Sequence, residues 1–269
     1  MEQTLASKTL SLHEWEQAEI KRSAFEASQT EVDDAALIDT ESNIARYMAP
    51  PAETPYPLEF AFHWLGDVRG KPVVDFGCGT GENSLLLAKR GAEVNAVDIS
   101  PDLIAIAQRR LWLNNVTAGV TFHTASVYEI PLPDESADVV FGMAILHHLD
   151  MRLAARETLR LLRPGGRAIF KEPVRNSKLL QLVRRIFPNR APDISPFERP
   201  LTDSELQEFA RGFASSRIRS FYLPTFSLAR MLPVVRNAVR PLAEADAALL
   251  KRFPSLAYYA TVKVIELTK

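Results

Sequence analysis

Two short apolar runs, each leading to an aspartate and separated by a glycine-rich turn, constrain the fold of this chain most. Residues 71–76 are typical of a buried parallel strand that includes Asp75, and the run at 94–97 leads to Asp98. The turn between them holds three glycines at every second position, Gly77, Gly79 and Gly81. Because the carboxyl ends of parallel strands meet at one edge of a sheet, the pattern predicts the nucleotide-binding half of a doubly wound sheet.

The spacing of the glycines favours one kind of ligand over another. A dinucleotide fingerprint reads G-x-G-x-x-G, whereas this chain reads G-x-G-x-G and has Glu82 where the last glycine would stand. Asp75, directly before the turn, is also unfavourable beside a pyrophosphate. The pattern therefore favours a ligand with an ammonium group and disfavours a nicotinamide oxidoreductase. A tight turn that binds nothing is the purely structural alternative.

Four segments, in this order, resemble the class I S-adenosylmethionine-dependent methyltransferases of the small-molecule type, including the quinone-ring group. They are D-F-G-C-G-T-G at 75–81, P-L-P-D-E-S-A-D-V-V at 131–140, M-A-I-L-H-H-L at 143–149 and L-R-P-G-G-R at 162–167. The resemblance implies an α/β fold with a doubly wound, mostly parallel, seven-stranded sheet. It also implies a closing antiparallel strand, for which residues 261–267 are the candidate.

The resemblance implies contacts to S-adenosylmethionine for several residues. Asp75 is expected to serve the ammonium end, directly or through water, and Asp98 to accept hydrogen bonds from two ribose hydroxyls. Ile99 is expected to lie against the adenine. Ser126 stands where many relatives have an aspartate, and its hydroxyl or the backbone of Val127 would contact the adenine amine. The other expected contacts come from the glycine turn and from the residue after the fourth strand: Gly77, Cys78, Gly79, Gly81 and Met143.

Three residues near the expected methyl group are candidates for catalysis. His147 and His148 follow the fourth strand, and a histidine can take a proton from a hydroxyl at neutral pH. Glu172 ends the fifth strand at the same sheet edge, where it would orient or deprotonate the acceptor. Each has a structural alternative, because the family's His-His-Leu segment is common without a base and a glutamate here can cap a turn or pair with an arginine.

These candidates favour oxygen as the methyl acceptor. C-methylation of a quinone-like or natural-product ring is the next hypothesis, and nitrogen and sulfur stay open. The fourth strand ends in F-G-M-A at 141–144 and not in an N-P-P-Y-like run, which disfavours methylation of amide or base nitrogens in protein or DNA. A non-catalytic S-adenosylmethionine-binding regulatory protein is compatible with the same motifs.

Composition narrows the class of protein further. The single cysteine, Cys78, cannot form an internal disulfide and argues against a zinc site, and we expect no metal. Residues 1–149 carry 10 Lys and Arg against 22 Asp and Glu, and residues 150–269 carry 22 against 11. The chain as a whole is near neutral, so we expect no nucleic-acid partner. With no visible signal peptide or membrane-spanning run, we expect a cytoplasmic monomer or homodimer.

Segments outside the core are predicted to be helical. Residues 1–50 are predicted to form an N-terminal helical cap, with an amphipathic helix at 9–28, and residues 51–269 the S-adenosylmethionine-binding domain. Helical insertions with basic, amphipathic stretches are predicted at 174–214 and 224–255. The helices of these two insertions would pack on the core, form a lid over the substrate, or contact a membrane surface or a partner subunit.

Overall fold

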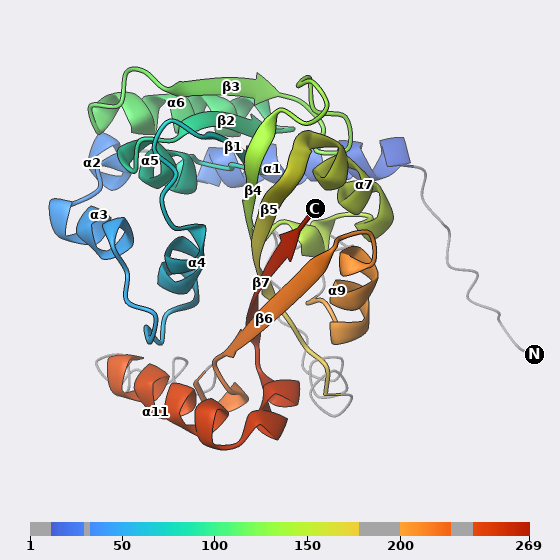
Figure 1. Ribbon diagram of the computed structural model, residues 1–269. Coiled ribbons are helices and arrows are strands. Elements are labelled where there is room, and N and C mark those ends of the chain that lie inside the picture. Colours follow the sequence, from blue (N-terminus) through green and yellow to red (C-terminus); the bar gives the residue numbers. More distant parts are fainter. Residues whose placement is uncertain (1–11, 30–32, 178–199, 227–238) are drawn as a thin grey trace, which may run out of the picture.

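The computed structural model describes residues 12–29, 33–177, 200–226 and 239–269. In these residues the strands form one sheet with helices on both faces (Figure 1). The strands are β1 (Pro72–Phe76), β2 (Glu93–Asp98), β3 (Val120–Thr124), β4 (Ala137–Met143), β5 (Leu162–Pro173), β6 (Ser215–Phe221) and β7 (Val262–Thr268). The helices are α1 (Leu12–Gln29), α2 (Asp34–Leu37), α3 (Glu41–Met48), α4 (Pro57–Leu65), α5 (Glu82–Lys89), α6 (Pro101–Leu113), α7 (Met151–Leu161), α9 (Asp203–Ala210) and α11 (Val239–Arg252), with 3-10 turns η1 (Leu146–His148) and η3 (Pro254–Tyr259).

The sheet has the order β3-β2-β1-β4-β5-β7-β6. β1 pairs in parallel with β2 and β4, β2 with β3, and β4 with β5. β7 runs antiparallel between β5 and β6, which confirms the predicted closing strand. The chain order reverses at β1 and β4, and this switch point is where doubly wound sheets bind their ligands.

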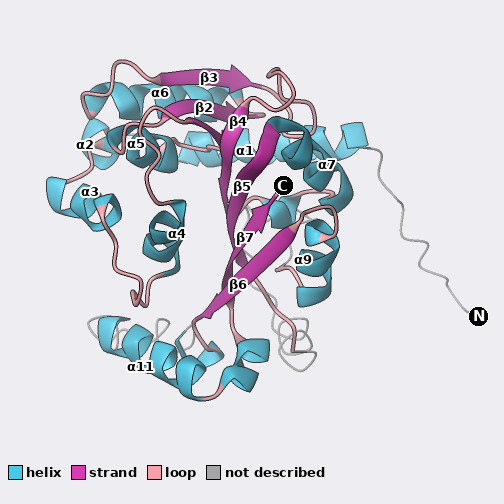
Figure 2. Cartoon of the chain, in the orientation of Figure 1, coloured by secondary structure: helices cyan, strands magenta, loops and turns pink. Residues whose placement is uncertain are grey.

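Helices lie on both faces of the sheet (Figure 2). Alternation along the central strands divides the core between these two faces. In β4, Val139 and Phe141 belong to the core cluster built with α4 and α5, whereas Val140 belongs to the cluster built with α7 and α9. β5 begins at Leu162, which pairs with Ala137 before the ladder becomes irregular. Strands buried on both faces explain the continuous apolar runs in the sequence.

Local signals place two helix N-termini beside the sheet edge. Gly81 adopts the left-handed conformation (φ 81°) directly before α5, and a Cβ there would lie 2.7 Å from the Cβ of Ala107 in α6. Ser100 caps α6, since its Oγ accepts a hydrogen bond from the N–H of Leu103 at 3.3 Å. Pro101 then occupies the first turn, where its missing N–H costs nothing.

Side chains of α6 fasten the N-terminal segment to the core. Asn114 donates from Nδ2 to the carbonyl of Leu37 and accepts from the N–H of Asp39, both at 2.8 Å. The buried Arg110 pairs with Asp39 at 3.2 Å and donates to the carbonyl of Thr80 in the glycine turn at 2.9 Å. α1 packs against the same helix. The segment before the core is therefore tied to the part of the sheet where the glycine turn lies.

The late segments are described in part. α9 lies within 174–214 and α11 within 224–255, whereas 178–199 and 227–238 are outside the described residues, with most of the basic amphipathic stretches. α9 buries Leu206 and Phe209 against the sheet, so this helix packs on the core. Among the described helices, none combines the length and apolarity that crossing a membrane requires.

Candidate active site

The glycine turn and the end of β2 are joined by hydrogen bonds. The N–H of Cys78 donates to the carbonyl of Val97 at 2.8 Å. Asp98 accepts from the N–H of Gly79 with Oδ2 and from the N–H of Ser100 with Oδ1, each at 2.9 Å. These hydrogen bonds fix the carboxylate of Asp98, a residue that is 8% exposed, beside the glycine turn.

Asp75 lies beneath the turn and is fully buried. Its Oδ2 accepts a hydrogen bond from the hydroxyl of Ser84 at 2.6 Å, and its Oδ1 has no hydrogen-bond partner within the described residues. Burial raises the pKa of this carboxyl to about 7, the charge of Asp98 adds to the rise, and the bond from Ser84 opposes it. A cationic group or a water reaching Oδ1 would therefore be stabilising.

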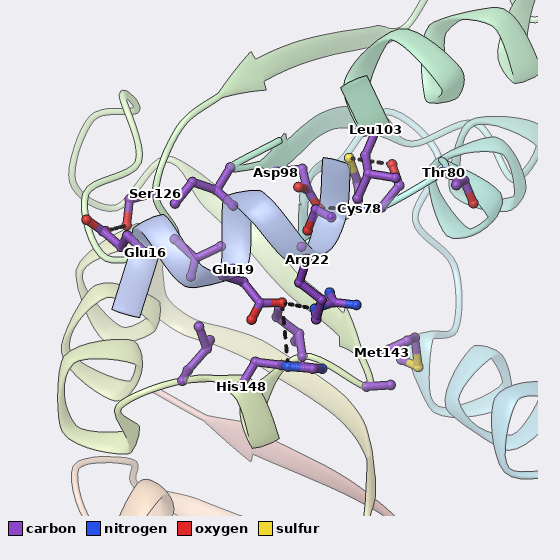
Figure 3. A pocket seen from close by; sticks show the side chains of 18 of the residues that line it. Glu16, Glu19, Arg22, Cys78, Thr80, Asp98, Leu103, Ser126, Met143 and His148 are labelled. Atoms are coloured by element: carbon purple, nitrogen blue, oxygen red, sulfur yellow. Dashed lines mark hydrogen bonds and ion pairs between the residues drawn. The ribbon is translucent and has the colours of Figure 1, made fainter. Parts of the chain in front are cut away.

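A cavity of about 260 Å³ opens at the carboxyl ends of β1, β2 and β4, and α1 lies across it (Figure 3). The glycine turn forms one wall, and Asp98 and Met143 line it from the strand ends. From α1, five residues line the same cavity: Trp15, Glu16, Glu19, Arg22 and Ser23. The N-terminal helix is thus part of the site.

Acidic side chains of α1 connect it to the sheet edge. Glu16 accepts a hydrogen bond from the hydroxyl of Ser126 at 2.6 Å. Glu19 pairs with Arg22, one turn further along the helix, at 2.5 Å. The same Oε1 of Glu19 lies 3.6 Å from Nδ1 of His148, as the dashed lines in Figure 3 show.

A buried carboxylate at the end of β5 organises the segment after β4. Glu172 accepts with Oε1 from the N–H groups of Ile145 and Leu146 at 2.9 Å, and its Oε2 lies 2.8 Å from Nδ1 of His147. Ala144, just before, adopts a left-handed backbone conformation with φ 56°. Glu172 therefore holds the turn that carries both histidines. The left-handed backbone conformation of Ala144 in this turn is rare for a residue other than glycine.

His148 faces the cavity, and its ring centroid lies 4.1 Å from that of His147. Burial lowers the pKa of His148 to about 3, and positive charge on His147 and Arg22 adds to the effect. The imidazole is therefore neutral at pH 7. Taking a proton inside the cavity requires a negative charge nearby to stabilise the product.

Comparison with known sequences relates this site to a family. The family described as "Methyltransferase domain" matches residues 74–170. A ubiquinone biosynthesis O-methyltransferase of Pseudomonas fluorescens is 30% identical over 160 residues, which cover 55% of this chain and 67% of that protein. The chain belongs to the class I S-adenosylmethionine-dependent methyltransferases.

Two other relatives of this methyltransferase carry names that specify O-methylation. A ubiquinone biosynthesis O-methyltransferase of Alkalilimnicola ehrlichii is 28% identical over 204 residues, covering 70% of this chain and 81% of that protein. The 27-O-demethylrifamycin SV methyltransferase of Amycolatopsis mediterranei is 37% identical over 100 residues, covering 36% of this chain and 37% of its own.

Solved structures show the same fold. The geranyl diphosphate C-methyltransferase of Streptomyces coelicolor, in complex with S-adenosylhomocysteine, has a TM-score of 0.59 at 15% identity and covers 94% of this chain and 96% of its own. A Haemonchus contortus phosphoethanolamine N-methyltransferase, also with S-adenosylhomocysteine, has a TM-score of 0.52 at 17% identity, with 75% and 49% covered. By the family membership given above, the chain is an enzyme whose cofactor is S-adenosylmethionine.

The residues of the methyltransferase site fit this cofactor. Apart from atoms of Gly79 and its two chain neighbours, no described atom lies within 4 Å of where a Cβ on Gly79 would stand, so the turn leaves open space beside Asp98. Among the described lining residues Arg22 is the only arginine or lysine, against Glu16, Glu19, Glu82 and Asp98. An acidic cavity favours a sulfonium and an ammonium group. Within the described residues, no group of three or more His, Cys, Asp or Glu could hold a metal ion.

The structure brings most of the predicted site residues to the cavity. The cofactor set contributes Gly77, Cys78, Gly79, Asp98, Ile99, Ser126, Val127 and Met143, and the catalytic set contributes His148. Four others lie behind this wall: Asp75, Gly81, His147 and Glu172. Glu172 is fully buried and bonded to the turn, so it matches the structural alternative of a residue that caps a turn. The binding and catalytic roles of all these residues remain predictions.

Sequence reasoning predicted an N-terminal helical cap but did not single out the residues of α1 that line the cavity. The amphipathic pattern of this helix suggested packing against the core, whereas Glu16, Glu19 and Ser23 line the cavity. Their spacing of three and four residues places them on one helix face, which is a signal of a polar face with a partner. The pattern alone does not specify which surface that face meets.

Proposed function

We propose that this methyltransferase transfers its methyl group to a hydroxyl of a small, ring-containing molecule. The observation that carries the proposal is His148, a neutral histidine on the wall of the same cavity as Asp98 and Met143. The names of the related O-methyltransferases favour the same acceptor atom. Phenols and quinols are the class to test first, because their hydroxyl protons are more acidic than those of alcohols.

The cofactor positions follow from the site. Asp98 is proposed to accept hydrogen bonds from the ribose, since a carboxylate has lone pairs beyond those its two backbone donors use. Ile99, Val127 and Ser126 are proposed to enclose the adenine. Ser126 is engaged by Glu16 in the present geometry, so the adenine amine would approach a hydroxyl already fixed by α1.

The proposed chemistry needs few groups from the protein. S-adenosylmethionine supplies an activated methyl on a sulfonium, so the protein needs to align a nucleophile and remove its proton. His148 is proposed to accept the hydroxyl proton. The neighbouring pair His147–Glu172 fixes the turn on which His148 stands, and residues of α1 line the same cavity. The proposed N-terminal cap at 1–50 would then contribute residues to the active site of the domain at 51–269.

The test is turnover of a panel of phenols and quinols by the wild type and by His148→Ala, with binding of S-adenosylhomocysteine measured by calorimetry. We expect the substitution to lower turnover by about 10²-fold or more while affinity for S-adenosylhomocysteine is retained. His123→Ala is the matched control, because His123 on β3 bonds Asn95 and is not part of the cavity wall.

Rates near wild type in both His147→Ala and His148→Ala would rule out a histidine base. The product decides the acceptor atom: a methyl bonded to oxygen in the NMR spectrum supports the proposal, and a methyl on a ring carbon would redirect it to C-methylation. Binding of S-adenosylhomocysteine with no turnover of any acceptor would favour a regulatory protein.

A further inference from the structure

The helix that covers the cavity places a carboxylate next to the candidate base. Oε1 of Glu19 lies 3.6 Å from Nδ1 of His148, and Glu19 is only 13% exposed through its side chain. Nδ1 of His148 is buried and makes no hydrogen bond to any described residue. A small side-chain movement would bring the two atoms within hydrogen-bonding distance.

Among the charged groups around His148, Glu19 is the one suited to balance a positive charge on the His148 ring. From α1, Glu19 and Arg22 face it, and from η1 the ring of His147 lies beside it. Glu172, behind His147, already uses both oxygens for His147 and two backbone N–H groups. Arg22 and His147 oppose a positive charge on His148, so of these neighbours Glu19 has the right sign and position.

We propose that Glu19 is a positioning residue that accepts a hydrogen bond from Nδ1–H of His148 and stabilises the imidazolium formed during methyl transfer. This inference rests on the proposed O-methyltransferase function. With the proton fixed on Nδ1, Nε2 is the ring nitrogen that can accept the proton of the acceptor hydroxyl. The oxygen–methyl bond forms with the oxygen's electron pair, and the carbon–sulfur bond breaks with its pair left on sulfur.

The pairing links the N-terminal helix to the chemistry. Glu19 comes from α1, whereas His148 comes from the turn after β4, so the pair exists only while α1 is docked. Arg22 pairs with the same oxygen, Oε1 of Glu19, at 2.5 Å, which limits the freedom of the carboxylate to turn away. The base is therefore completed by the same helix that closes the cavity.

The experiment compares Glu19→Gln and Glu19→Asp with the wild type. Glu14→Gln is the matched control, since Glu14 is an exposed glutamate on the same helix and does not line the cavity. One measurement is kcat across the pH range with a substrate found in the panel above. The other is the ¹⁵N spectrum of the histidine rings without cofactor or substrate, which reports which nitrogen of His148 carries the proton.

We expect Glu19→Gln to lower kcat by about tenfold or more, a part of what the whole base contributes, with S-adenosylhomocysteine affinity within threefold of wild type. The acid limb of the kcat profile should move to lower pH, because loss of a negative charge destabilises the imidazolium. The Nδ1–H signal of His148 should weaken in Glu19→Gln and be unchanged in Glu14→Gln.

The order of the variants separates charge from shape. If Glu19 balances charge, kcat should fall in the order wild type, Glu19→Asp, Glu19→Gln, because Asp keeps the charge. If Glu19 only fills space, kcat should fall in the order wild type, Glu19→Gln, Glu19→Asp, because Gln keeps the size. The inference is overturned if Glu19→Gln retains the wild-type kcat, if the order is that of a packing role, or if the ring spectrum of His148 does not change. Wild-type activity in His148→Ala would instead reject the base itself, and with it the proposed function.

Discussion

Asp75 and Asp98 stand at the ends of neighbouring strands in contrasting environments. Asp98 accepts a hydrogen bond from a backbone N–H with each oxygen and reaches the cavity. Asp75 is fully buried, and among the described residues only one of its oxygens is hydrogen-bonded. These two carboxylates on neighbouring strands thus stand in different environments, and burial raises the pKa of the inner one, Asp75, to about 7.

The raised pKa of Asp75 predicts a pH dependence of stability. Its pKa is about 7 in the fold and near 3.8 when unfolded, so the unfolded chain loses this proton first as the pH rises. The protonated carboxyl of Asp75 therefore makes its full contribution to the free energy of unfolding below about pH 3.8, and this contribution is lost as the pH rises to about 7. Asp75→Asn removes the titration, and the free energy of unfolding relative to wild type should rise by up to about 2–3 kcal/mol between pH 5 and pH 8.

Urea unfolding of both proteins at the two pH values, without cofactor, measures this difference. Ser84→Ala is an informative companion, since the hydroxyl of Ser84 donates to Asp75 and opposes the rise in pKa. A constant difference between Asp75→Asn and wild type across this range would show that the carboxyl titrates normally in the fold.

At the scale of elements, the close approach of α5 and α6 depends on one glycine. Gly81 and Gly165 both have positive φ, 81° and 77°, but a Cβ on Gly81 would lie 2.7 Å from Cβ of Ala107, whereas one on Gly165 meets nothing within 4 Å. Both alanine substitutions should lose about 1–2 kcal/mol for the backbone conformation. Gly81→Ala should lose about 1–3 kcal/mol more, because α6 must move. Thermal or urea unfolding of the pair measures the difference, and equal losses would contradict it.

The elements also show what the sequence could predict. Strands β1 and β2 lie where the apolar runs at 71–76 and 94–97 predict them, and helices α5 and α6 begin at local signals, the glycine turn and the cap Ser100. The N-terminal cap was predicted, but the residues by which α1 faces the cavity could not be, since an amphipathic pattern describes a face and not its partner. For the same reason Glu19 was not a candidate, although His148, on a turn fixed by strand order, was.

At the scale of the whole molecule, cofactor binding should raise thermal stability. A ligand at 100 times its Kd stabilises the fold by about 2.7 kcal/mol, and in a chain of this size each kcal/mol raises Tm by about 2–4 °C. S-adenosylhomocysteine should therefore raise Tm by about 5–10 °C at that concentration, whereas NAD should leave it unchanged.

Asp98→Ala is the control for this shift. The variant should fold but lose most of the response, because two charge-assisted hydrogen bonds to the ribose are worth about 10²-fold in affinity or more. A full shift in Asp98→Ala would remove the ribose assignment. A shift with NAD in place of S-adenosylhomocysteine would contradict the cofactor.

The insertion of β7 between β5 and β6 has a consequence for biosynthesis. Because β6 leaves the ribosome before β7, the edges of β5 and β6 that pair with β7 have no partner until β7 has been translated. Val264, Ile265 and Leu267 of β7 are fully or almost fully buried in the core clusters on the two faces of the sheet, so the apolar residues packed against them are exposed in the nascent chain until β7 is added. A premature stop codon before β7 would leave a chain with two open sheet edges, which is a substrate for chaperones and for aggregation.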